Sequence, residues 1–363
     1  MNFKICTLLT LFKILLTSAL SWGQSFSFIT QLEIPHLHKV DKTSVGGLSA
    51  LALDESSGFY FAVSDDRGKY GDSRFYKFHL EQNKSTNDFK VTDLSAVVIK
   101  FPKPRDPKNV LDMEGLAILP WGNILISTEG DLNKKPRVNP RLFEVKVDGT
   151  YVRDYEVPES FLPEPTGLQK NGIGDNKGFE GLTSWKGEFW LATEEPLKQD
   201  RSLHKTKSFI RMIQYKMPQA WVLKPSAQGL YPLGSDSPDQ GISLVGVSSI
   251  LPLNTKELLV LERAAELDIT GVHFRSKIYK VEMNLFEQEA AMLKQNLEVL
   301  SKKLVIDLAK AFPDKEQDNF EGLAWGPTLK TGEKTLLIIS DDNFSKHQKS
   351  LIWVLKLANV DKK

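Results

Sequence analysis

Residues 112–129 read DMEGLAILPWGNILISTE, and this stretch decides the fold. Two apolar runs flank the sequence Pro120-Trp121-Gly122-Asn123, an arrangement typical of a β-hairpin closed by a tight turn. Glu114 stands at the start of the first run and Glu129 follows the second. The stretch therefore predicts two antiparallel strands whose open end carries a pair of carboxylates.

The same hairpin pattern occurs five times, with a period of about 65 to 76 residues. The copies run from Gly46 to Asp65, Glu114 to Glu129, Glu180 to Glu194, Val245 to Glu262 and Glu321 to Asp341. A third strand follows each hairpin, and a fourth follows most of them. The last copy has no fourth strand of its own, and Phe26 to Ile34 is expected to supply it.

This periodicity predicts an all-β fold, a β-propeller of four-stranded blades with five readable repeats, whose ring is closed by the mature N-terminal strand. A six-bladed propeller is an alternative, and a chain of unrelated β-sandwich domains is another. The segment Asn284–Asn296 looks helical and is interpreted as an insertion between strands.

The composition excludes several classes of protein. The 363 residues carry 47 Lys and Arg against 46 Asp and Glu, which leaves no positive surplus for a nucleic-acid backbone. With 41% hydrophobic and 10% aromatic residues, the chain has too much core-forming material to be disordered. A globular protein that does not bind nucleic acid is predicted.

Residues 1–23 have the pattern of a secretory signal peptide, with an early Lys4, a short apolar run and small residues near Gly23. We expect an exported protein, periplasmic or secreted, in which residues 24–363 form a single domain with no membrane span. Cys6 is the only cysteine, so the mature chain has neither disulfides nor a cysteine nucleophile.

The hairpin register brings acidic residues together. Antiparallel partners lie at equal distances from their turn, so the two carboxylates of each hairpin are expected side by side at one channel mouth. The predicted rim consists of Asp65, Glu114, Glu129, Glu180, Glu194, Glu262, Glu321 and Asp341. Such crowded like charges need cations or protons. Oxygen ligands without Cys suit Ca²⁺ better than Zn²⁺. Alternatively, these carboxylates serve only turns and salt bridges that hold the blades together.

Long connections are predicted at the same end of the blades, at residues 102–113, 158–179, 195–208 and 264–272. Functional residues concentrate on long loops carried by a rigid scaffold. The carboxylate end is therefore the predicted functional face.

The motif series as a whole resembles a known family. Its members here are Val63-Ser64-Asp65-Asp66-Arg67-Gly68, Asp112-Met113-Glu114-Gly115-Leu116, Gly178-Phe179-Glu180-Gly181-Leu182, Ala192-Thr193-Glu194-Glu195-Pro196, Asp318-Asn319-Phe320-Glu321-Gly322 and Ser340-Asp341-Asp342-Asn343-Phe344. In order and spacing they are similar to the phytase-like family known as "esterase-like activity of phytase". The resemblance implies a secreted, propeller-like phosphatase or esterase. Val245 and Gly46 depart from the pattern where three other copies have Glu.

The leading hypothesis is an exported phytase-like or esterase-like hydrolase that acts on a small-molecule phosphate ester. Ca²⁺ held by the carboxylates would activate water, while Arg67, Arg74, Arg141 or Arg263 would bind phosphate oxygens. A serine esterase is disfavoured, because Gly47-Leu48-Ser49-Ala50-Leu51 lacks the second glycine of a nucleophile elbow. The alternative is a non-catalytic, calcium-stabilised propeller that binds a protein, glycan or lipid partner. The sequence indicates no oligomeric state.

Overall fold

The computed structural model describes residues 26–83, 88–102, 111–201, 208–219, 221–234, 242–283 and 299–357. The predicted signal peptide (1–23) and the predicted helix Asn284–Asn296 lie outside these residues. Strands predominate in the described part, whose helices are only η1 (Glu159–Phe161) and α1 (Leu308–Ala311). None of these helices has the length and apolar character needed to cross a membrane.

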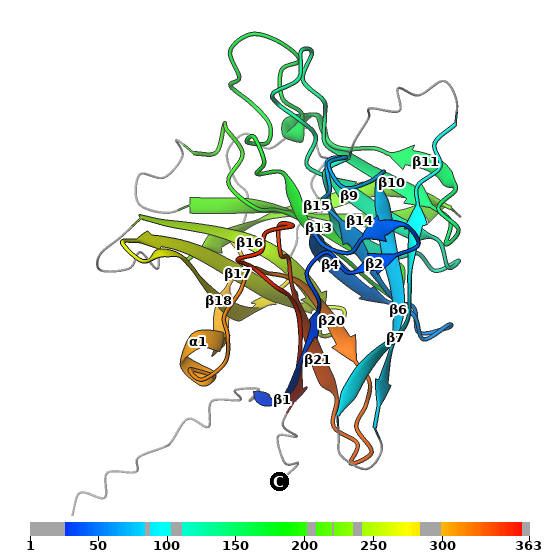
Figure 1. The fold of residues 1–363 in the computed structure, drawn as a ribbon. Coiled ribbons are helices and arrows are strands. Elements are labelled where there is room, and N and C mark those ends of the chain that lie inside the picture. The colour runs from blue at the N-terminus through cyan, green and yellow to red at the C-terminus, as the bar shows by residue number, and fades with distance from the viewer. Residues whose placement is uncertain are drawn as a thin grey trace, which may run out of the picture.

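Five four-stranded antiparallel sheets form the blades of a propeller, which confirms the predicted fold (Figure 1). Blade one contains β4 (Leu48–Leu53), β5 (Tyr60–Ser64), β6 (Arg74–Gln82) and β7 (Phe89–Val98). Blade two contains β8 (Met113–Ile118), β9 (Ile124–Thr128), β10 (Arg141–Val145) and β11 (Tyr151–Tyr155). Blade three contains β12 (Phe179–Trp185), β13 (Glu188–Thr193), β14 (Ser208–Gln219) and β15 (Val222–Leu233).

Blade four contains β16 (Ile242–Pro252), β17 (Glu257–Asp268), β18 (Gly271–Glu282) and β19 (Lys302–Asp307). Blade five contains β20 (Phe320–Gly326), β21 (Thr335–Ser340), β22 (Ser350–Leu357) and the N-terminal strand β1 (Phe26–Ile34). A small separate hairpin consists of β2 (Lys39–Val40) and β3 (Thr43–Ser44).

The ring closes by pairing of the two ends of the described chain. Strand β1 runs antiparallel to β22, from Phe26 opposite Leu357 to Ile34 opposite Ser350. The indole Nε1 of Trp353 also donates to the side-chain oxygen of Gln31, at 2.9 Å. Closure by Phe26–Ile34 is therefore confirmed, with five blades rather than six.

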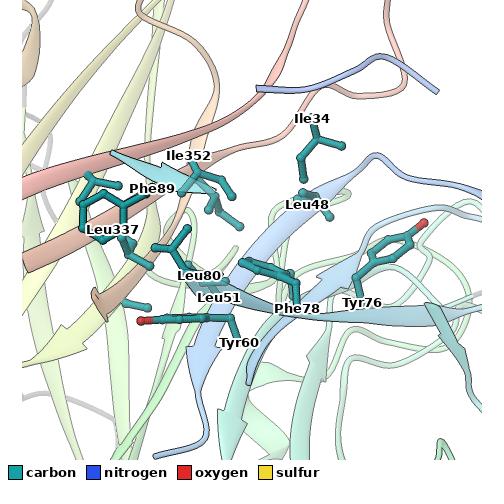
Figure 2. Close-up of a cluster of buried hydrophobic side chains, with 14 of the residues drawn as sticks. Ile34, Leu48, Leu51, Tyr60, Tyr76, Phe78, Leu80, Phe89, Leu337 and Ile352 are labelled. Carbon is teal, nitrogen blue, oxygen red and sulfur yellow. The ribbon is translucent and has the colours of Figure 1, made fainter. Parts of the chain in front are cut away.

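The first strands of the blades, β4, β8, β12, β16 and β20, adjoin one another in ring order around the central axis. Apolar clusters fill the spaces between blades. Figure 2 shows the cluster in which Leu51 and Tyr60 of blade one meet Leu337 and Ile352 of blade five. These clusters form a rigid base beneath the mouth of the channel.

Each first strand contains a β-bulge at the same place in its blade. In β8, for example, Met113 pairs with Thr128 and Gly115 with Ser127, so that one extra residue lies between the two pairs. The extra residues of the five blades are Ser49, Glu114, Glu180, Ser248 and Glu321. Because a bulge turns its side chain out of the regular alternation, all five can face the mouth.

The bulges correct the repeat alignment that the sequence predicted. Ser49 and Ser248, rather than Gly46 and Val245, are equivalent to the bulged glutamates, and Val245 pairs with Ala264 instead of Glu262. In both blades the predicted alignment starts three residues too early, because it aligns the glycine that follows Gly46 or Val245 with Gly115.

Blade four also departs from the predicted loop at residues 264–272. Strands β17 and β18 continue through this segment and pair from Glu257 opposite Glu282 to Asp268 opposite Gly271. Its alternation of small, charged and apolar residues suits a continued hairpin. The result is a longer hairpin at the mouth in place of a predicted loop.

The approach of neighbouring first strands predicts a strict requirement for Gly115. A Cβ atom there would lie 2.6 Å from the Cβ of Leu182 and 2.9 Å from the carbonyl oxygen of Glu180. We expect Gly115→Ala to lower the free energy of unfolding by about 1–3 kcal/mol in urea titrations. Gly122→Asn is the control, because nothing lies within 4 Å of that position and Asn tolerates its positive φ. Equal stability of Gly115→Ala and the parent protein would contradict this packing.

Candidate functional site

Two rings of side chains converge at the mouth of the channel. The bulged residues Ser49, Glu114, Glu180, Ser248 and Glu321 form the first ring. The second ring consists of Asp65, Glu129, Glu194, Arg263 and Asp341. Four of these residues directly follow the second strand of their hairpin, whereas Arg263 occupies the equivalent position within β17. Blade four thus contributes a serine and an arginine where other blades contribute carboxylates. The repeat therefore brings acidic side chains together at the mouth, and Arg263 is the one cationic member of the two rings.

Most of these side chains line one cavity of about 410 Å³. Its described lining includes seven carboxylates, namely Asp65, Asp66, Glu114, Glu180, Glu194, Glu321 and Asp341. Four cationic side chains, Arg67, Lys69, Lys177 and Arg263, line it as well. Acidic groups therefore outnumber basic groups at the mouth, although the whole chain is nearly neutral.

Arg263 is the central cation of the cluster. Its guanidinium donates to Glu194 at 2.8 Å, to Glu321 at 2.5 Å and to the side-chain oxygen of Asn319. Burial alone would lower the pKa of Arg263, but the carboxylates of Glu321 and Glu194 outweigh burial and raise it. Arg263 therefore stays charged and connects carboxylates from two other blades.

Two further cations flank this centre. Lys177 donates to both carboxylate oxygens of Glu194, at 2.9 and 2.8 Å. Arg67 donates to the carboxylate of Asp112 and to the side-chain oxygen of Asn176. With 46% of its side chain exposed, Arg67 is the more accessible of the two arginines at the cavity.

Several carboxylate oxygens of the two rings remain without a hydrogen-bond partner among the described residues. They are Oδ1 of Asp65, Oε2 of Glu129 and Oε2 of Glu180, all buried. Glu129 and Glu180 are themselves only 2% and 6% exposed. An unpaired buried carboxylate oxygen is costly, so these atoms need a proton or a cation.

Burial and mutual repulsion raise the pKa values of the cluster. Burial raises the pKa of Glu114 well above its ordinary value, and the carboxylates of Glu180 and Asp112 raise it further. The pKa values of Glu129, Glu180 and Asp341 are raised in the same way, first by burial and then by neighbouring carboxylates. Burial, followed by Glu321 and Asp112, raises the pKa of Asp65 to about 7. Without bound cations, these carboxyl groups therefore keep their protons to higher pH than exposed carboxyl groups do.

Three of the residues predicted for the site, Glu262, Arg74 and Arg141, do not line the cavity. Glu262 accepts hydrogen bonds from Tyr231 of blade three and from Lys302 of blade four. Arg74 is fully buried against Asp66 and Tyr76, and Arg141 pairs with Asp154 on the outer strands of blade two. Glu262 precedes Arg263, so it occupies the position of Ser64 or Thr128 in the other blades, and neither of these residues lines the cavity.

The site also contains residues that the sequence reasoning missed. Asp112 and Asn319 each stand two residues before a bulged glutamate, and Lys177 stands three before one. Their position two or three residues before the repeated Glu-Gly pair is a signal that could have identified them. Tyr70 and Phe344 line the same cavity from irregular turns, which carry no periodic signal.

The sequence matches one family model, described as "Phytase-like: Esterase-like activity of phytase", over residues 43–344. Since the match extends over most of the chain, the chain belongs to the phytase-like family, as its motifs indicated. No curated protein matches the chain.

Solved structures similar to the chain include the allergen Mala s 1 of Malassezia sympodialis, at 15% identity and a TM-score of 0.38, covering 90% of this chain and 83% of that one. An endo-arabinase from Bacteroides thetaiotaomicron aligns at 11% identity and a TM-score of 0.43, covering 89% and 98% respectively. An alpha-L-arabinanase from Penicillium chrysogenum aligns at 12% identity and a TM-score of 0.39, covering 86% and 80%.

Loss of the central cation is predicted to be strongly destabilising. Arg263→Gln leaves Glu194 and Glu321 buried without their shared partner, so we expect the free energy of unfolding to fall by about 3–5 kcal/mol. Arg141→Gln is the matched control, because its partner Asp154 is 46% exposed and such pairs contribute less than about 1 kcal/mol. Chemical denaturation of both variants in the presence of a chelator measures the difference. Similar losses in the two variants would argue against Arg263 as the central counterion.

The raised pKa values also predict the pH dependence of stability. The folded protein without metal ions keeps protons that the unfolded chain releases above about pH 4 to 5. The free energy of unfolding is therefore expected to be highest below that pH. It should decline as the pH rises through the pKa of about 7 of Asp65. Thermal unfolding in chelator should give a higher midpoint at about pH 5 than at about pH 8. A midpoint that rises over this range would contradict the protonated cluster.

Proposed function

We propose that this member of the phytase-like family is an exported hydrolase of phosphate esters that uses a divalent cation, Ca²⁺, at the acidic cavity. The observation that carries the proposal is a surplus of buried carboxylates whose oxygens lack partners. Export follows from residues 1–23, which have the pattern of a signal peptide.

The carboxylates at the mouth fit a hard cation. Two groups of three, Asp112 with Glu114 and Glu129, and Glu129 with Glu180 and Glu194, each offer ligand atoms within 4.8 Å of one another. The unpartnered oxygens of Glu129 and Glu180 belong to these groups. All of these ligands are oxygens, which favours Ca²⁺ over thiolate- or imidazole-binding metals.

A phosphate ester is an anion, and the surplus of acids would repel it in the absence of a bound cation. When bound, Ca²⁺ would supply positive charge and a water molecule of lowered pKa. Arg67 is the residue best placed to bind a phosphate oxygen, because it lines the cavity and remains partly exposed. Arg263 and Lys177 would hold Glu194 in place, since both already donate to it.

A matched pair of variants tests the cation site. We expect the chelator-treated protein to bind Ca²⁺ in calorimetric titrations, and Glu180→Gln to weaken binding by at least about tenfold because it removes a ligand. Glu262→Gln is the control, since this buried glutamate lies outside the cavity. If the parent protein fails to bind Ca²⁺ or another divalent cation, the metal proposal is wrong.

Hydrolysis is tested on phytate, 4-nitrophenyl phosphate and 4-nitrophenyl acetate, each with and without Ca²⁺. The proposal expects Ca²⁺-dependent release of phosphate, reduced in Glu180→Gln and retained in Glu262→Gln. Calcium-independent cleavage of the acetate alone would favour an esterase. Calcium binding with no activity on the three substrates would favour the non-catalytic binding propeller.

A further inference from the structure

The acidic cavity has an aromatic side that the proposed phosphate chemistry does not use. Tyr70, Phe274 and Phe344 line it together with the carboxylates, and all three are partly buried. They come from three blades, since Tyr70 follows β5, Phe274 lies in β18 and Phe344 follows β21. The cavity thus combines a charged region with an aromatic one.

Phe344 is held at the cavity in a strained backbone conformation. Asn343 and Phe344 have φ values of 46° and 50°, in the left-handed region that bulky residues avoid. The buried carboxylate of Asp342 accepts from the backbone N–H of Phe344 and of Gly47, each at 3.0 Å. This carboxylate therefore fixes the strained turn to the chain that leads into β4.

The Phe344 ring is closely packed by Tyr70 and by two glycines. It stacks on Tyr70 with ring centres 4.3 Å apart and planes 14° from parallel. Cβ atoms at Gly46 and Gly47 would lie 2.8 and 2.7 Å from atoms of this ring, so only glycine fits at these two positions. Phe344 is thus a fixed support for Tyr70, whose ring also lies 5.0 Å from the ammonium of Lys69.

We propose that this aromatic region, defined as Tyr70, Phe344 and Phe274, binds a flat ring in the organic part of the substrate. An aromatic ring in the core needs no strained backbone, whereas strain kept at a cavity wall is characteristic of binding sites. Planar rings stack favourably on a rigid aromatic support. The substrate class is then an aryl ester. Its charged end would lie at the carboxylates, and this part of the inference rests on the proposed function.

Two phosphonates that are not hydrolysed test the inference without requiring catalysis. Phenylphosphonate and methylphosphonate carry the same charged group, and calorimetry in the presence of Ca²⁺ compares their affinities. We expect the phenyl compound to bind about threefold to tenfold more tightly, the range of an aromatic pair. Tyr70→Ala should abolish this difference and leave methylphosphonate binding unchanged, whereas Tyr70→Phe should keep it.

Other outcomes of this comparison would overturn the aromatic subsite. Equal affinities of the parent protein for the two phosphonates would show that no ring is recognised. An equal loss of affinity for both compounds in Tyr70→Ala would show that the stacking of Tyr70 on Phe344 only stabilises the turn that contains Phe344.

A third probe separates this inference from the proposed function. Benzyl alcohol carries a ring without a charged group, and saturation-transfer NMR detects its contact with the protein. If neither phosphonate binds but benzyl alcohol binds in a way that Tyr70→Ala removes, the phosphate chemistry is wrong and the aromatic subsite is supported. If neither phosphonate binds and benzyl alcohol shows no contact either, the aromatic subsite is wrong as well.

Discussion

The structure depends on one constraint, the convergence of five first strands on a single axis with one extra residue in each. The bulge directs the side chain of that residue toward the mouth, and three of the five are glutamates. Because the following positions in β8 and β12 pack tightly against the next blade, the strands have little freedom to move apart. The like charges therefore cannot relieve their repulsion by separation, and they need protons or cations instead.

Blade four is the departure from symmetry that makes this arrangement possible. The second ring contains four carboxylates, and a fifth would add repulsion. Arg263 occupies the fifth position and forms ion pairs with Glu194 and Glu321. The same blade replaces a bulged glutamate with Ser248, whose hydroxyl donates to the backbone carbonyl of Phe320. Its longer hairpin also brings Phe274 to the cavity. One blade thus changes the charge, the hydrogen bonding and the shape of the mouth.

The sequence predicted the blades and their closure because apolar runs and turn residues recur at regular intervals, down to the strand Phe26–Ile34. It predicted that acids gather at the mouth because the hairpin ends repeat. It misplaced Glu262 because it aligned Val245 with Glu114, three residues before Ser248, which is the true equivalent. It misplaced Arg74 and Arg141 because these long side chains form ion pairs with nearby residues, Asp66 and Asp154 respectively. The order of the strands does not reveal such pairs.

Stability and function are coupled at this mouth. The apolar clusters between the blades hold the carboxylates in place, so the free energy of folding sustains a site that is electrostatically unfavourable when empty of cations. A cation that binds Glu129 and Glu180 only in the folded protein would raise the free energy of unfolding. The positive charges of Arg263, Lys177 and Arg67 neutralise only part of the negative charge at the mouth. In the proposed function, the same negative surplus that weakens the protein without metal ions would hold the cation, and the cation would hold the anionic ester.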